Sequence, residues 1–243
     1  MDHELRLYAH RGSSARFPEN TLAAFRAALE EGANALELDV HVTADRELVV
    51  CHDPDLVRTA GLALRIRETR LADLREITIG GETERLSLLG EVLETFPATP
   101  MSVDLKPRDP RAVGMLVDLV EAHGRPERIT LASFHDPIVR AFRRRHAGPT
   151  ALTHREVTLL RIAPWLARIV AGDAAQIPVT WRGIRLDTPR FIARCRRLGL
   201  RIDYWVVNDP ETAARLLDRG ATGVMTDEPA RLAPLFAERT EAL

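Results

Sequence analysis

The stretch Ala35–Val42, with the sequence ALELDVHV, decides which fold the chain favours. Alternate residues of a β-strand point to opposite faces, so Glu37 and Asp39 share one face while apolar neighbours fill the other. Two carboxylates on one face of an otherwise apolar strand are costly to bury unless that face opens on a site. In an α/β barrel the carboxyl ends of the strands converge on such a site.

Short β-rich runs and amphipathic helical stretches alternate along the whole chain. We expect strands at 5–9, Ala35–Val42, Met101–Leu105, Ile129–Ala132, 150–153, about 177–180, 200–207 and Gly223–Thr226. The stretches 21–31, Pro110–Ala122, 189–198 and 210–217 have the apolar spacing or the terminal signals of helices. Eight strands separated by helices predict a parallel sheet closed into a (β/α)8 TIM barrel. A flat doubly wound sheet is the alternative, although no glycine-rich dinucleotide turn follows the first strand.

One segment interrupts this alternation after the second strand. Residues 47–52 can form a hairpin with Ala35–Val42, and residues 54–86 form an insertion with a short helix near 71–76. The length of 243 residues suits a single barrel of ~250 residues. We therefore expect one domain over 1–243 that carries this insertion.

Composition is that of an ordinary globular protein, with 45% apolar and 28% charged residues. The net charge of -1 gives no indication of a nucleic-acid partner. Cys51 and Cys195 are too few for a disulfide framework, so we expect two reduced, packed thiols. No stretch approaches the ~20 apolar residues of a membrane span, and the first residues lack the pattern of a secretory signal. A cytoplasmic protein is therefore expected. The arginines at 143–145 lie on a helical stretch and are expected to be solvated.

Three carboxylates are expected at one mouth of the barrel, because Asp104 repeats the arrangement of Glu37 and Asp39 in a second strand. Together they would repel each other and any phosphate. A hard divalent cation resolves this repulsion, since Mg²⁺ and Ca²⁺ take oxygen ligands and can bridge to phosphate. We therefore interpret the three as metal ligands. The alternative is compensation by Arg11, Lys106 and other bases without a metal.

His10 and His52 each follow a strand-like run and stand beside a charged residue. Imidazole titrates near pH ~6.5, so the pair can supply a proton acceptor and a proton donor. Arg11 and Lys106 would hold the non-bridging oxygens of a phosphate group. These residue types together indicate metal-assisted chemistry on a phosphate ester.

Several motifs occur in the order found in one known family. They are His10-Arg11-Gly12, Pro18-Glu19-Asn20-Thr21, Glu37-x-Asp39, His52-Asp53, Asp104-x-Lys106-Pro107, Ser133-Phe134, Trp205-x-Val207-Asn208 and Thr226-Asp227. In these motifs the chain resembles the glycerophosphodiester phosphodiesterase family over nearly its whole length. The resemblance implies a (β/α)8 barrel, the two histidines as acid–base pair, the three carboxylates on a metal and the lysine on phosphate.

Two further site residues rest on this resemblance. It implies that Glu19 is a site carboxylate that touches the metal or orients Arg11, and that Trp205 forms a wall beside the alcohol portion of the substrate. For Trp205 the alternative is an aromatic that fills the barrel. The chain departs from the family pattern at Asp104, where the family usually has Glu, and at Val206, where it has Thr.

The predicted activity is metal-dependent hydrolysis of glycerophosphodiesters to sn-glycerol 3-phosphate and an alcohol, with Mg²⁺ or Ca²⁺ as cofactor. We favour His10 as base and His52 as acid; the nucleophile is either the adjacent glycerol hydroxyl, through a cyclic phosphate, or water. One alternative is phospholipase D-like cleavage of lysophospholipids, with an acyl groove formed by residues 62–79 of the insertion. Another is a catalytically silent phosphodiester-binding barrel. The expected partner is a small-molecule glycerophosphodiester, without nucleic acid or stable membrane insertion.

Overall fold

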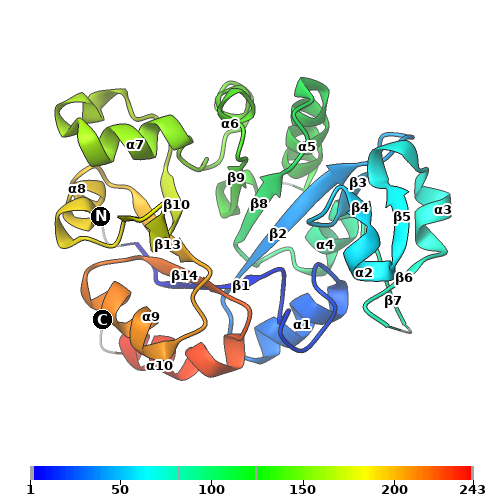
Figure 1. Ribbon diagram of the computed structural model, residues 1–243, viewed down its shortest axis with the longest axis horizontal. Coiled ribbons are helices and arrows are strands. Elements are labelled where there is room, and N and C mark those ends of the chain that lie inside the picture. Colours follow the sequence, from blue (N-terminus) through cyan, green and yellow to red (C-terminus); the bar gives the residue numbers. More distant parts are fainter. Residues whose placement is uncertain (1–2, 82, 124, 242–243) are drawn as a thin grey trace.

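A barrel of parallel strands forms the centre of the computed structural model, which describes residues 3–81, 83–123 and 125–241 (Figure 1). The terminal residues 1–2 and 242–243 of the expected domain lie outside the described residues. The parallel strands are β1 (Arg6–His10), β2 (Ala35–Val42), β8 (Met101–Leu105), β9 (Ile129–Ala132), β10 (Ala174–Pro178), β13 (Arg201–Trp205) and β14 (Gly223–Thr226). They pair in the order β10-β13-β14-β1-β2-β8-β9, so the first and last strands of the chain lie side by side.

Two residues bridge the remaining gap between β9 and β10. Thr150 pairs with Leu131, and Ala151 pairs with Ala174, both in parallel. The full strand expected at 150–153 is therefore wrong. The chain turns into a helix here, because the Thr153 side chain accepts a hydrogen bond from the backbone N–H of Glu156 at 3.2 Å. The predicted barrel class is confirmed, with seven strands and two bridging residues in its described wall.

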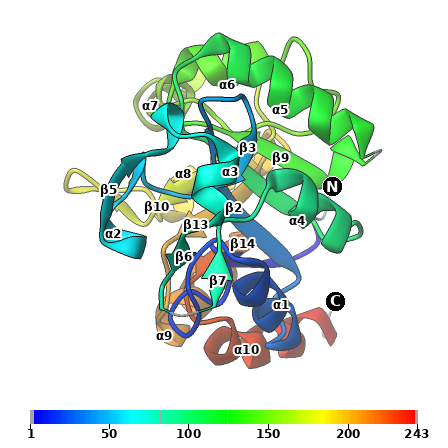
Figure 2. The same ribbon diagram turned by 90° about the vertical axis from the view of Figure 1, so that its right-hand side faces the viewer.

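Helices surround the barrel in both views (Figures 1 and 2). The helices around the barrel are α1 (Leu22–Glu30), α4 (Leu89–Thr95), α5 (Pro110–Ala122), α6 (Asp136–Phe142), α7 (His154–Ile162), α8 (Pro189–Arg197), α9 (Pro210–Asp218) and α10 (Pro229–Glu241). Helix α5 is typical: Val113, Leu116, Val117 and Val120 are buried, at the spacing of one helical face. The 3₁₀ turns η2 (Pro126–Arg128) and η3 (Pro164–Ile169) and the hairpin of β11 (Thr180–Trp181) and β12 (Ile184–Arg185) complete this part.

The insertion begins after β3 (Leu48–Val50), which pairs antiparallel with β2 as the sequence predicts. It then contains β4 (Asp55–Leu56), α2 (Val57–Ala60), β5 (Leu62–Arg65), η1 (Ile66–Glu68), α3 (Leu71–Arg75), β6 (Thr78–Ile79) and β7 (Glu84–Arg85). Its apolar side chains form a small core of their own around Leu56, Ile66 and Leu74. Figure 2 shows this segment in front of β2 and β3.

Two details bear on the expectations from sequence. Cys51 and Cys195 are both buried and free, as expected of packed thiols. Within the described ranges, no helix combines the length and the apolar character needed to cross a bilayer.

Candidate active site

One cavity of about 330 Å³ opens at the carboxyl ends of the barrel strands. The predicted residues that line it are His10, Arg11, Glu37, Asp39, His52, Asp104, Lys106 and Trp205. Strand register explains their convergence, since His10 is paired with Glu37 across β1 and β2, and Asp39 with Asp104 across β2 and β8. Glu19 does not line the cavity but accepts a hydrogen bond from Arg11, which does.

Lys106 and Arg11 compensate the charge of Asp39. Lys106 Nζ lies 2.7 Å from Asp39 Oδ1 and 2.6 Å from Asp104 Oδ2. Arg11 Nε lies 3.1 Å from Asp39 Oδ2. Burial raises the pKa of Asp39, but the two cations outweigh it and hold this pKa below its usual value. Asp104 has one cation beside it, and burial raises its pKa above the ordinary value despite Lys106.

Two buried carboxylate oxygens of the site have no hydrogen-bond partner among the described residues, Glu37 Oε2 and Asp104 Oδ1. Burial, together with the charge of Asp39, raises the pKa of Glu37 to about 8. Buried polar atoms are nearly always paired, so these two oxygens of one pocket are free to accept from or coordinate a ligand. Oxygen is the donor that Mg²⁺ and Ca²⁺ prefer, so the donor set fits such an ion. In the described chain, however, no three His, Cys, Asp or Glu side chains are already arranged to enclose one, and the Lys106 ammonium contacts two of the three candidates.

His10 is held by a carboxylate from the far end of the chain. Its Nδ1 lies 2.7 Å from Asp227 Oδ1, and its Nε2 lies 3.9 Å from Glu37 Oε2. Burial lowers the pKa of His10, but the hydrogen bond to Asp227 and the charge of Glu37 raise it more, so the net shift is upward. Burial likewise raises the pKa of Asp227, while hydrogen bonds from His10 and Asn208 bring it down to about 2.

A chain of hydrogen bonds connects His52 to Arg11. His52 Nδ1 lies 2.7 Å from Asp53 Oδ1, and Arg58 Nε donates to Asp53 Oδ2 at 2.7 Å. The same guanidinium donates two hydrogen bonds of 2.7 Å to Glu19, whose Oε1 also accepts from Arg11 at 3.2 Å. Of the two roles that the resemblance implies for Glu19, this contact favours the orientation of Arg11.

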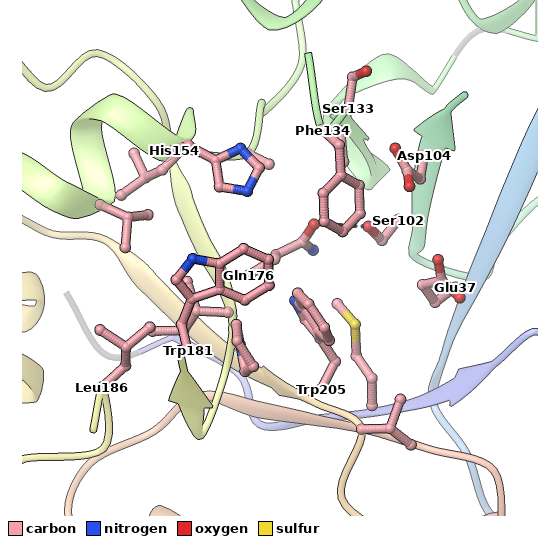
Figure 3. A pocket seen from close by; sticks show the side chains of 18 of the residues that line it. Glu37, Ser102, Asp104, Ser133, Phe134, His154, Gln176, Trp181, Leu186 and Trp205 are labelled. Carbon is pink, nitrogen blue, oxygen red and sulfur yellow. Dashed lines mark hydrogen bonds between the residues drawn. The ribbon is translucent and has the colours of Figure 1, made fainter. Parts of the chain in front are cut away.

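Aromatic rings form a wall opposite the carboxylates (Figure 3). The Phe134 ring is 5.9 Å from that of Trp205 and 5.5 Å from that of His154, and the ring of His154 is 5.9 Å from that of Trp181. Lys106 Nζ lies 5.5 Å from the centre of the Phe134 ring. Trp205 therefore takes part in a wall of the pocket.

The sequence profile of the glycerophosphoryl diester phosphodiesterase family matches residues 10–231. The chain belongs to this family. The resemblance stated from sequence is confirmed, and so is the enzyme class, since members of the family are phosphoric diester hydrolases.

Individual relatives of this family are similar over most of their length. The chain is 28% identical to a glycerophosphodiester phosphodiesterase of Caldanaerobacter subterraneus subsp. tengcongensis, with 92% of this chain and 94% of that protein covered. It is 27% identical to a human lysophospholipase D, with 92% of this chain and 83% of that protein covered. The crystal structure of a glycerophosphodiester phosphodiesterase from Thermotoga maritima has a TM-score of 0.79 and 26% identity, and covers 97% of this chain and 100% of that one.

Sequence reasoning missed three contributors to this phosphodiesterase site. Asp227 and Asp53 orient the two histidines, and Arg58 binds both Asp53 and Glu19. Asp53 directly follows His52, so that signal was present in the sequence. Asp227 stands in a quoted motif, but only the pairing of β1 with β14 brings it to His10.

Proposed function

We propose that the protein is a divalent-cation-dependent phosphodiesterase that hydrolyses glycerophosphodiesters to sn-glycerol 3-phosphate and an alcohol. The observation that carries the proposal is that both imidazoles, the three carboxylates and two cationic side chains line one pocket. Each imidazole also has its own carboxylate partner at 2.7 Å. This arrangement provides proton transfer at two points and positive charge for a phosphate group.

Glu37, Asp39 and Asp104 would hold the cation, Mg²⁺ or Ca²⁺. When bound, it supplies Lewis-acid polarisation of the phosphoryl oxygen. Support comes from the two buried carboxylate oxygens without a hydrogen-bond partner in the described chain. Arg11 and Lys106 would bind the remaining phosphate oxygens, the first as a fork and the second as a point charge.

The histidines would move the protons. A carboxylate only accepts hydrogen bonds, so Asp227 and Asp53 favour a proton on Nδ1 of each ring and leave Nε2 for the substrate. His10 would take the proton of the attacking oxygen, and His52 would give one to the departing alcohol. The attacking oxygen is the adjacent glycerol hydroxyl or water, and trapping of a cyclic phosphate product separates these routes.

Glycerol 3-phosphate release from glycerophosphocholine tests this proposal. We expect chelation to abolish release and Mg²⁺, Ca²⁺ or Mn²⁺, restored one at a time, to recover it. His10→Ala and His52→Ala should each lose roughly 10²- to 10⁴-fold in rate, while His123→Ala, on the C-terminal cap of α5, serves as the control. Unchanged release with chelator would remove the metal from the mechanism, and activity retained in the double variant would refute the histidine roles.

Cleavage of lysophospholipids is the second candidate function, because the pocket has many apolar lining residues and one relative is a lysophospholipase D. The insertion was the expected source of an acyl groove. That expectation is wrong, since no described residue of 54–86 lines the pocket. A catalytically silent barrel is disfavoured, because both histidines and all three carboxylates are present in the pocket of a hydrolase family member. The cytoplasmic location stays a prediction.

A further inference from the structure

The pocket extends past Phe134 and Trp205, away from the carboxylates. We call this part the apolar arm and define it by lining residues that share an apolar side chain: Leu152, Val157, Ile162, Trp181, Ile184 and Leu186. Figure 3 shows Trp181 and Leu186 on the opposite side of the pocket from Glu37 and Asp104, with Phe134 and Trp205 between them. The arm and the proposed catalytic groups therefore belong to one continuous cavity.

One wall of the arm is a single face of α7. The pocket-lining residues of this helix are His154, Val157, Thr158, Arg161 and Ile162, which follow the three- and four-residue spacing of one helical face. The buried side chains of this helix, Glu156 and Leu160, lie on its opposite face. The face of α7 that does not pack inward therefore lines the cavity.

The other wall is the β11–β12 hairpin. Trp181 and Ile184 are paired across it, and Arg182 and Gly183 form its turn with φ values of +48° and +80°. Two consecutive positive φ angles are typical of the tight turn that joins two-residue hairpins. The base of the hairpin is tied down, because Arg185 donates to the buried carboxylate of Asp187 at 2.6 and 2.9 Å. The wall is thus an ordered hairpin with a tight turn and an ion pair at its base.

Apolar side chains of the arm are exposed at its open edge. Ile162 is 66% exposed, Ile184 50% and Trp181 40%. Large apolar side chains at the edge of a cavity mark a binding site, and 330 Å³ lies in the range of sites for drug-sized ligands. The arm offers a chain of methylenes many contacts and few hydrogen-bond partners. His154, Thr158 and Arg161 are the polar members of the helical wall.

We propose that the apolar arm binds one acyl or alkyl chain of the substrate, so that the enzyme accepts lysophospholipids. This inference rests on the proposed function for the chemical step. In the net reaction the bond from phosphorus to the head-group oxygen breaks, the oxygen of one water molecule becomes bonded to phosphorus, directly or by opening a cyclic phosphate, and the head-group alcohol leaves with a proton. The product is an acylglycerol phosphate, which keeps its chain in the arm until release.

Chain length tests the arm independently of turnover. The probe is a series of lysophosphatidylcholines from hexanoyl to decanoyl, kept below their micelle concentrations and titrated calorimetrically into the His10→Ala/His52→Ala protein. Burial of one methylene strengthens binding about fourfold. We therefore expect the dissociation constant to fall by up to about this factor per methylene until the arm is full. Affinity that does not depend on chain length would overturn the proposal.

Two isoleucine variants localise the effect. Ile184→Asp, made in the same double variant, should flatten the chain-length series, because it places a charge in the wall of the arm. Ile169→Asp is the matched control, since Ile169 is 61% exposed and does not line the pocket. If both substitutions removed the dependence of the dissociation constant on chain length to the same extent, the proposal would be refuted.

Turnover of glycerophosphocholine separates this inference from the proposed function. In an otherwise wild-type chain, Ile184→Asp should leave this chainless substrate within about twofold of normal, which also shows that the variant folds. Loss of turnover of both substrates in Ile184→Asp would contradict a chain-specific role. Chain-dependent binding in a protein that never cleaves glycerophosphocholine would support the arm and refute the proposed function.

Discussion

His10 Nδ1 and Asp227 Oδ1 lie 2.7 Å apart, although 217 positions separate them in the chain. Parallel pairing of β1 with β14 sets Ala9 opposite Thr226, which places both side chains at the carboxyl edge of the barrel. Ser14 Oγ donates to Asp227 at 3.0 Å and Asn208 Nδ2 donates to it at 2.9 Å. Asp227 is therefore a fixed acceptor that orients the imidazole.

Asp227→Asn should lower kcat by roughly 10²- to 10⁴-fold with a small effect on KM. An amide can donate to Nδ1 and so favours the tautomer with the proton on Nε2, the wrong one for a base. Steady-state kinetics on glycerophosphocholine measure this change. Asp118→Asn is the control, because its side chain is 71% exposed on the surface. If the Asp227→Asn variant had the same kcat as the control, catalysis by His10 would not require a carboxylate partner.

Glu37→Gln should abolish the stabilisation of the protein by divalent cations. At a free Mg²⁺ or Ca²⁺ concentration 100 times Kd, binding to the folded state alone contributes ~2.7 kcal/mol, or roughly 5–10 °C in Tm for a domain of this size. Thermal unfolding with and without the ion gives the shift for the wild type, for Glu37→Gln and for the exposed control Glu47→Gln. Equal shifts in all three proteins would place the ion elsewhere.

Arg143→Met should destabilise the fold by about 3–5 kcal/mol, because it leaves Glu156 buried without its counter-ion. The guanidinium donates to Glu156 at 2.8 and 2.7 Å, and the side chains are only 15% and 9% exposed. The solvated role expected for Arg143 is therefore wrong. Urea unfolding measures the change, and the exposed neighbour variant Arg144→Met should stay within about 0.5 kcal/mol of wild type.

The same ion pair gives a pH dependence with a definite sign. Burial raises the pKa of Glu156, but hydrogen bonds from Arg143 and the backbone lower it more, so the pKa lies below its usual value. Its stabilisation is present above the unfolded pKa of ~4.3 and is lost as pH falls through the folded pKa. In Arg143→Met the folded pKa rises instead, so the difference between the two proteins should be largest at neutral pH and shrink on acidification. A constant difference would contradict this assignment.

Gly12→Ala should destabilise the chain more than Gly61→Ala does. Both glycines have positive φ, +85° and +71°, so both substitutions bear the same backbone strain of ~1–2 kcal/mol. A Cβ on Gly12 would lie 2.6 Å from Ala24 Cβ and 2.7 Å from its carbonyl carbon, whereas nothing lies within 4 Å of one on Gly61. The extra crowding adds roughly 1–3 kcal/mol. Equal urea midpoints for the Gly12→Ala and Gly61→Ala variants would show that the turn after Arg11 accommodates the added methyl group without crowding.

Sequence reasoning succeeded where a short pattern carries the structure. The bounds of β2, β8, β9 and β14 agree with the expected strands, because their apolar runs end at clear polar or glycine signals. Polar residues at every second position of β2 and β8 likewise predicted that Glu37, Asp39 and Asp104 lie in one pocket, as they do.

It failed where the outcome depends on contacts between distant segments. The run at 150–153 has strand-like residues, but the capping box of Thr153 and Glu156 ends the pairing after two of them. The sequence alone does not distinguish Arg143 from its exposed neighbour Arg144, because only the fold places Glu156 beside Arg143. The apolar arm needs α7 and the β11–β12 hairpin to face each other, which no local pattern encodes.

Pairing of β1 with β14 also has a consequence for biosynthesis. A ribosome adds about 5–20 residues per second, so the 217 positions between His10 and Asp227 correspond to roughly ten to forty seconds of translation. Throughout that interval the nascent polypeptide carries the His10 imidazole without the aspartate that aligns it. Hydrolytic competence should therefore arise only as the final strand leaves the exit tunnel and joins the earliest one.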